Sequence, residues 1–197
     1  MINSDNLESI NGNEGSFSSI TLKTPNVKTI DLNSSKYSGL LTLNDFKSYP
    51  NLNSVNIANS KMSLNCDGLD LKTLNISNIV NVNSEITIRN CNKLEKFICS
   101  NATLKSLTIR PINQSLSFTN CNINSYNLSS KVEDASIVIE NDTNVENVTL
   151  SGFKNITIKN CPKLRKVTIY KSEYATENIS ITYCNNAVLT VVTNDID

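Results

Sequence analysis

Short hydrophobic triplets of the form apolar, polar, apolar recur along most of this chain. Residues 156–169 read ITIKNCPKLRKVTI and contain one complete repeat. It consists of the triplet Ile156-Thr157-Ile158 (strand A), a polar corner, and a second apolar set formed by Leu164, Val167 and Ile169 (strand B). Alternation over a few residues places successive side chains on opposite faces, which indicates short β-strands.

The repeat has further copies at 86–99 (ITIRNCNKLEKFIC) and 116–128 (LSFTNCNINSYNL), and weaker ones near residues 20, 41, 62, 137 and 179. Spacers between triplets are too short and too polar to hold helices. The pattern predicts an all-β, parallel β-solenoid of about eight coils of about 22 residues, with two short strands per coil. Leu104–Ile109 breaks the alternation and is expected to take the strand A role in its coil.

The middle residues of the triplets are small and polar, and they are expected to form ladders facing solvent. Strand A carries Thr42, Thr87 and Thr157 there, and strand B carries Asn75 and Thr168.

The ends of the chain differ from its centre. Residues 1–16 are polar and are interpreted as an arm or a cap, while residues 17–197 form a single repeat domain. The stretch AVLTVVTNDID at 187–197 is an apolar strand with an acidic end. An uncapped last coil would let another chain stack on it, so homo-oligomerisation is an open alternative.

Composition agrees with this architecture. About one residue in six is asparagine, whereas the chain has only five glycines. Asparagine tolerates the left-handed backbone conformation and bonds to neighbouring backbone groups, so we expect it in the corners, stacked in ladders between coils.

Cysteines recur near the same corner, at positions 66, 91, 121, 161 and 184, which favours buried packing of a small thiol. Metal binding is disfavoured because the chain has no histidine and no CxxC. Cys66/Cys91 and Cys161/Cys184 fall in neighbouring coils, where disulfides are the alternative to the favoured free thiols.

Charge excludes several classes of function. The 18 basic and 18 acidic residues balance, so the strongly positive surface of a nucleic-acid binder is not expected. No apolar run is long enough to span a bilayer, and the first residues lack a secretory h-region. Membrane insertion is therefore not expected, and the location is left open between a virion component, the cytoplasm and non-classical export.

Candidate chemistry is sparse. Without histidine, a nucleophile–histidine pair is impossible, and the best acidic group, Glu140, Asp142 and Glu146, is interpreted as a solvated corner. No catalytic residue, metal or cofactor is predicted. Basic residues form a strip at Lys93, Lys96, Lys105 and Arg110, and again from 159 to 171. The candidate binding residues are Lys159, Lys163, Arg165, Lys166, Thr157 and Thr168, facing a protein partner or a surface glycan.

The corner-to-strand segments resemble leucine-rich repeats of the BspA-like class, whose repeats run C-x-x-L-x-x-V-x-I. The matching residues are Cys91, Leu94, Phe97 and Cys99, and Cys161, Leu164, Val167 and Ile169. This resemblance implies a surface adhesin or binding scaffold. The lack of a signal peptide and the compact length also suit a structural module of an assembly, such as a virion fibre or decoration protein. The segment 148–161 also resembles the right-handed parallel β-helices of pectin-degrading enzymes and phage tailspikes. That resemblance implies, as the alternative, a polysaccharide-cleaving enzyme.

Overall fold

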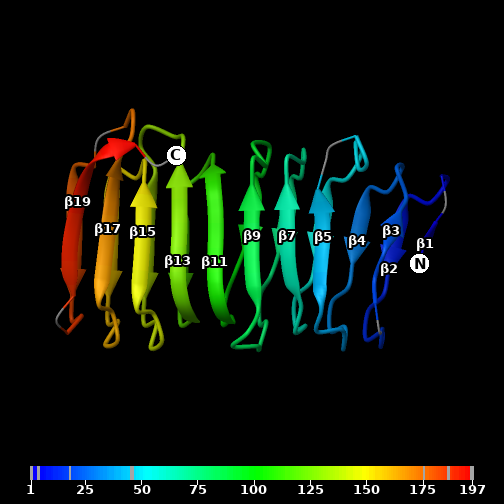
Figure 1. The fold of residues 1–197 in the computed structure, drawn as a ribbon, viewed down its shortest axis with the longest axis horizontal. Helices are drawn as coiled ribbons and strands as arrows, with labels where there is room; N and C mark the ends of the chain where they lie inside the picture. The colour runs from blue at the N-terminus through cyan, green and yellow to red at the C-terminus, as the bar shows by residue number, and fades with distance from the viewer. Residues whose placement is uncertain are drawn as a thin grey trace.

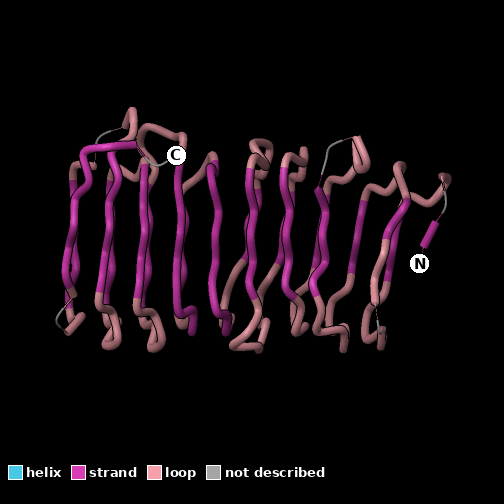
Figure 2. The backbone as a smooth tube through the Cα atoms, in the orientation of Figure 1, coloured by secondary structure: helices cyan, strands magenta, loops and turns pink. Residues whose placement is uncertain are grey.

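The protein is a parallel β-solenoid wound along one long axis (Figure 1). The computed structural model describes residues 2–3, 5–17, 19–44, 47–174, 176–185 and 187–195. Every regular element among them is a strand, and the chain makes about nine coils of about 21 residues. The predicted all-β solenoid is confirmed. Figure 2 shows the strands of successive coils lying side by side, joined by loops at both edges.

One sheet of eight strands, which we call the long sheet, runs along most of the rod. Its strands are β5 (Leu40–Asn44), β7 (Ser63–Asp67), β9 (Glu85–Arg89), β11 (Thr103–Ile112), β13 (Asn122–Ser130), β15 (Asn147–Ser151), β17 (Lys166–Lys171) and β19 (Val188–Asp195). Each strand is hydrogen-bonded to the strand one coil away, about 4.8 Å distant in a β-sheet.

Two shorter sheets form the opposite layer. The N-terminal back sheet holds β2 (Ser9–Asn11), β4 (Thr29–Asp31), β6 (Ser54–Asn56), β8 (Thr73–Asn75) and β10 (Lys96–Ile98). The C-terminal back sheet holds β12 (Leu116–Thr119), β14 (Ser136–Glu140), β16 (Asn155–Lys159) and β18 (Asn178–Thr182). β1 (Ile2–Asn3) pairs with β3 (Leu22–Lys23). β2 thus places part of segment 1–16 beside β4, and the role of this segment as arm or cap stays a prediction.

The core lies between the two layers, and stacked inward side chains fill it. One such stack contains Ile86, Leu107, Tyr126, Val148 and Val167, which are register partners on five successive strands and are all buried. Burying an aliphatic or aromatic side chain of this size contributes roughly 1.5–3 kcal/mol. The repeated triplets therefore hold the rod together along its whole length.

Strands A and B do not stay in separate sheets, which corrects the expected ladders. The early strand A segments β5, β7 and β9 lie in the long sheet, but β12, β14, β16 and β18 form the C-terminal back sheet. The segment Leu104–Ile109, which breaks the alternation, lies in β11 and takes the next place in the long sheet. The following strand A copy, β12, is therefore displaced by half a coil. Thr42 and Thr87 consequently share a face with Thr168, while Thr157 lies on the opposite layer.

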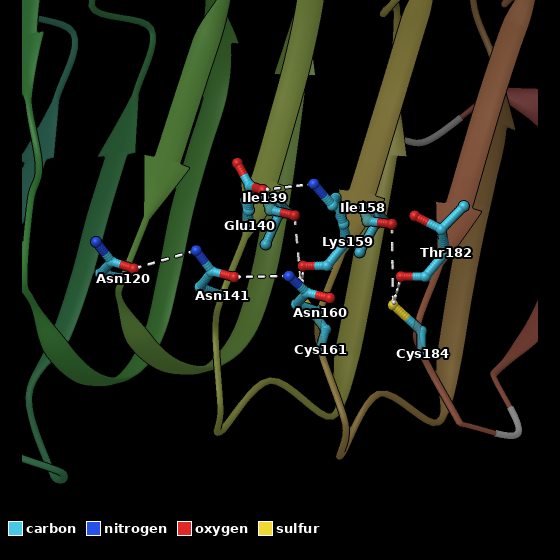
Figure 3. Close-up of polar contacts among 10 residues, drawn as sticks. All are labelled: Asn120, Ile139, Glu140, Asn141, Ile158, Lys159, Asn160, Cys161, Thr182 and Cys184. Atoms are coloured by element: carbon cyan, nitrogen blue, oxygen red, sulfur yellow. Dashed lines mark hydrogen bonds and ion pairs between the residues drawn. The ribbon is translucent and has the colours of Figure 1, made fainter.

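Asparagines form the corners after the strands of the C-terminal back sheet (Figure 3). Asn120, Asn141 and Asn160 all have a φ between 54° and 58°, in the left-handed region. The Asn141 side chain donates to Asn120 Oδ1 at 3.3 Å, and the Asn160 side chain donates to Asn141 Oδ1 at 2.9 Å. The predicted asparagine ladder is confirmed. Because asparagine adopts the left-handed φ that tight corners need, a chain with few glycines can form them.

The residue after each of these asparagines packs inward. Cys121 and Cys161 occupy that place and are buried, in agreement with the predicted packing of small thiols. All six cysteines are free thiols, and Cys66 Sγ lies 3.6 Å from Cys91 Sγ. Asp142 takes the same place one coil earlier than Cys161 and is fully buried, so its interpretation as part of a solvated corner is wrong.

Candidate anion-binding groove

A groove of about 710 Å³ lies at the carboxyl ends of the long-sheet strands. Four cationic side chains line it: Arg89, Arg110, Lys131 and Lys171. Serine hydroxyls complete much of the surface, from Ser129, Ser130, Ser151 and Ser172, and Glu173 supplies the carboxylate among the lining residues. The groove is therefore a polar and predominantly cationic concavity.

Strand register brings the four cations together. Arg89 and Arg110 are the last outward residues before the corners of β9 and β11, and they are direct register partners. Lys131 follows β13 immediately, and Lys171 ends β17. Outward residues alternate with core residues, so the packing of Ile88 and Ile109 fixes the direction of the two arginines.

Two irregularities of the long sheet coincide with the groove. The register between β11 and β13 shifts between Ile109 and Ile112, beside Arg110. The register between β17 and β19 shifts between Tyr170 and Lys171. Such shifts bend a strand and redirect its side chains, and they are frequent beside functional sites. Figure 1 shows the last part of β19 turning across the ends of its neighbouring strands.

The cations of the groove have no counter-ion among the described side chains of residues 5–193. None of the four makes an ion pair or a side-chain hydrogen bond within that part of the chain. Asp67 is the register partner of Arg89, but its Oδ1 accepts a hydrogen bond from Asn90 at 2.9 Å. Partial burial and the neighbouring Arg89 lower the pKa of the Arg110 guanidinium. Two adjacent unneutralised guanidinium groups repel each other, and a bound anion would relieve that repulsion.

The backbone under the groove is tightly packed. Gly152 has a φ of 73°, and a Cβ atom added there would lie 2.2 Å from the Ser130 carbonyl oxygen. Ser130 Oγ donates to the Ile112 carbonyl at 3.3 Å, which ties the corner of β13 to that of β11. Glycine at 152 thus lets β15 approach β13 closely enough to form a continuous groove floor.

Comparisons with known proteins give no relative for this chain. No family model, curated protein or solved structure matches it. Among the described residues, no helix is long and apolar enough to cross a membrane. Nor do those residues contain three Cys, Asp or Glu side chains grouped so as to hold a metal ion.

The six candidate binding residues from the sequence do not form one surface. Thr157 and Lys159 lie on the C-terminal back sheet, whereas Lys166 and Thr168 lie on the long sheet. Lys163 and Arg165 occupy the corner between β16 and β17.

Local partners limit some of these candidates. Lys159 Nζ is 3.1 Å from Glu140 Oε1, and Lys163 Nζ donates to Asn144 Oδ1 at 3.0 Å. Only 7% of Thr168 is exposed. Ligand binding by these six residues stays a prediction.

The groove combines residues that the sequence singled out with others that it did not. Arg110 and Lys171 belong to the basic strip of the sequence, whereas Arg89 and Lys131 lie outside it. The available signal was the position after each core triplet: a basic residue follows the apolar-polar-apolar triplet directly at Arg89 and Arg110. Recognising their proximity would have required the 21-residue register between them.

Proposed function

We propose that this protein is a non-enzymatic recognition module that displays its solenoid surface to an anionic partner, either a surface glycan or the acidic face of a protein. The observation that carries the proposal is the convergence in one groove of four cations that make no ion pair with the described side chains of residues 5–193. Charged hydrogen bonds from arginine to a carboxylate, sulfate or phosphate are short and strong, and their paired geometry gives specificity.

The fold suits such a role because a solenoid is a stack of similar coils that presents a long, regular surface. The resemblance to BspA-like leucine-rich repeats also favours a binding scaffold, in an adhesin or in an assembly such as a virion. The balanced net charge speaks against nucleic acid as the partner, since a duplex binder normally carries a strong positive excess.

Absence of enzymatic activity is part of the proposal. The carboxylates that came nearest to a catalytic group are engaged elsewhere: Glu140 pairs with Lys159, and Asp142 is buried beneath a corner. Glycoside cleavage needs two carboxylates facing one substrate across a cleft. The groove contains Glu173 alone among its lining residues, so it favours binding without cleavage.

Titration calorimetry of the full chain with an anionic glycan (heparin) and an acidic polypeptide (poly-glutamate) tests the proposal. We expect at least one probe to bind, more weakly as salt is added. The double substitution Arg89→Gln/Arg110→Gln should lower the affinity at least about tenfold, since two charged contacts are lost. Lys28→Gln/Lys154→Gln removes the same charge at two ion-paired lysines outside the groove and should change the affinity little. Equal losses in the two variants, or no binding by the parent protein, would refute the proposal.

Self-association is a second candidate role, and the last coil favours it. Ile179, Leu189 and Val191 are 40%, 43% and 63% exposed, whereas their register partners one coil earlier, Ile156, Val167 and Ile169, are 3% exposed or less. A second copy stacked on this coil would cover these apolar side chains. Light scattering over a concentration series tests this, and a mass of one chain at every concentration would exclude it.

A further inference from the structure

The groove cations follow one another across the strands, along the axis of the solenoid. Arg89 is on β9, Arg110 on β11, Lys131 directly after β13, and Lys171 on β17. The first three cations come from neighbouring coils. Because adjacent strands lie about 4.8 Å apart, the row from β9 to β17 spans roughly 19 Å. A ligand that contacts all four must be elongated and must lie nearly perpendicular to the strands.

The spacing discriminates among elongated anions. In an extended peptide, side chains on one face recur at every second residue, or roughly every 6.6 Å. Acidic residues of such a peptide would fall out of step with Arg89, Arg110 and Lys131, which come from three successive strands. A chain of pyranose sugars advances by one residue over a length close to the inter-strand distance. Successive carboxylate or sulfate groups on a polysaccharide can therefore keep pace with successive coils.

Uncharged groups continue the row beyond the arginines. Ser129, Ser151 and Tyr170 occupy successive register positions on β13, β15 and β17, at the same edge of the long sheet. The Tyr170 side chain is half-buried at this edge of the sheet. Serine hydroxyls suit sugar hydroxyls, and an aromatic ring suits the apolar face of a pyranose. Ser151 is buried and its hydroxyl donates to the Lys171 carbonyl, so Ser129 and Tyr170 are the groups that a polyphosphate would leave without a counterpart.

We infer that the groove binds a linear anionic polysaccharide, a chain of uronate or sulfated sugars that crosses β9 to β17 with about one sugar per coil. The inference rests on the proposed function and specifies its ligand. The four cations neutralise the acidic groups, while Ser129 and Tyr170 contact the sugar rings. Because the contacts come from several coils, affinity must depend on the length of the polysaccharide.

Calorimetry with size-defined oligosaccharides tests this inference on the full chain. The probes are oligogalacturonates for the uronate class, heparin-derived oligosaccharides for the sulfated class, and polyphosphate and poly-glutamate of equal charge. We expect affinity to rise with oligosaccharide length up to about four or five sugars, the span of β9 to β17, and then to level off. Binding of one oligosaccharide class and not the other decides between carboxylate and sulfate.

Variants connect this binding to the groove. Tyr170→Ala should weaken oligosaccharide binding about tenfold and leave polyphosphate binding within about twofold, as loss of an aromatic contact predicts. Tyr183→Ala, a substitution of a largely exposed tyrosine in the last coil, is the matched control and should have no effect. Circular dichroism spectra must be unchanged for both variants.

The outcomes separate the two levels of the proposal. If poly-glutamate or polyphosphate binds as tightly as the best oligosaccharide through Arg89 and Arg110, the polysaccharide inference fails while the proposed recognition function stands. If no anionic probe binds, or if binding ignores the arginines, both fail. A length dependence that is flat from the disaccharide upward overturns the extended binding mode.

Discussion

Gly152 and Gly68 offer a sharp test of how the coils are packed. Both have a left-handed φ, 73° at Gly152 and 66° at Gly68. An added Cβ would lie 2.2 Å from the Ser130 carbonyl oxygen at Gly152, but it would meet nothing within 4 Å at Gly68. Alanine therefore adds backbone strain at both positions and a steric overlap at only one.

The structure sets the size of the two effects. The left-handed conformation costs alanine about 1–2 kcal/mol, of which about 0.4–1 kcal/mol is offset by the reduced entropy of the unfolded chain. We therefore expect Gly68→Ala to lower the free energy of unfolding by roughly 0.5–1.5 kcal/mol. Gly152→Ala should lose about 1–3 kcal/mol more, because relieving the overlap forces β15 away from β13.

Urea unfolding followed by circular dichroism measures both variants. Gly68→Asn is a useful control, because asparagine adopts the same conformation at the equivalent corner residue Asn90 and should cost less than alanine. Gly152→Ala should also weaken anion binding, since Ser130 and Ser151 line the groove. Equal destabilisation by the two alanine substitutions would refute the close approach of β15 to β13.

Three further measurements probe the corners. Asn141→Ala removes two ladder hydrogen bonds and a residue that tolerates a left-handed φ, so it should lower the free energy of urea unfolding by about 2–3 kcal/mol. Asn141→Gly keeps the tolerance of a left-handed φ and should cost only about 1 kcal/mol. Burial raises the pKa of the Asp142 carboxyl despite its four hydrogen-bond donors. The protonated Asp142 therefore contributes its full stability below the unfolded pKa of about 4, and this contribution is lost as the pH rises through the folded pKa. The midpoint of urea unfolding, measured at a series of pH values, should fall over this range in the parent protein and not in Asp142→Asn. Burial also raises the pKa of Cys161 to about 12, so mass spectrometry after alkylation at mildly alkaline pH should find the half-buried Cys184 modified well before Cys161.

The repeat architecture was predictable because its signal is local. Alternation within each triplet fixes which side chains face inward, and the recurring Asn-Cys step marks the corner. The places where prediction failed depend on relations between coils. Asp142 looked like a surface acid in isolation, although it occupies the place that Cys121 and Cys161 hold in neighbouring coils. Comparing equivalent positions would have shown its burial.

The groove was harder to predict than the fold for the same reason. Arg89 and Arg110 become neighbours only through the 21 residues between them, and this coil length varies along the chain, from 19 between β15 and β17 to 25 between β4 and β6. Register shifts at Ile109 and Tyr170 have no marker in the residue pattern. The exchange of strand A between the sheets likewise arises from one irregular segment in β11. Local periodicity determines the scaffold, and its irregularities determine the site.

The two back sheets are separate, with no strand pairing between β10 and β12 among the described residues. At that point the backbone hydrogen bonds of the long sheet join the halves of the rod, together with core contacts. A rod pulled along its axis should therefore yield there first, because fewer hydrogen bonds share the load. We expect single-molecule extension to show two force peaks rather than uniform peeling, with each half of the solenoid acting as a mechanical unit.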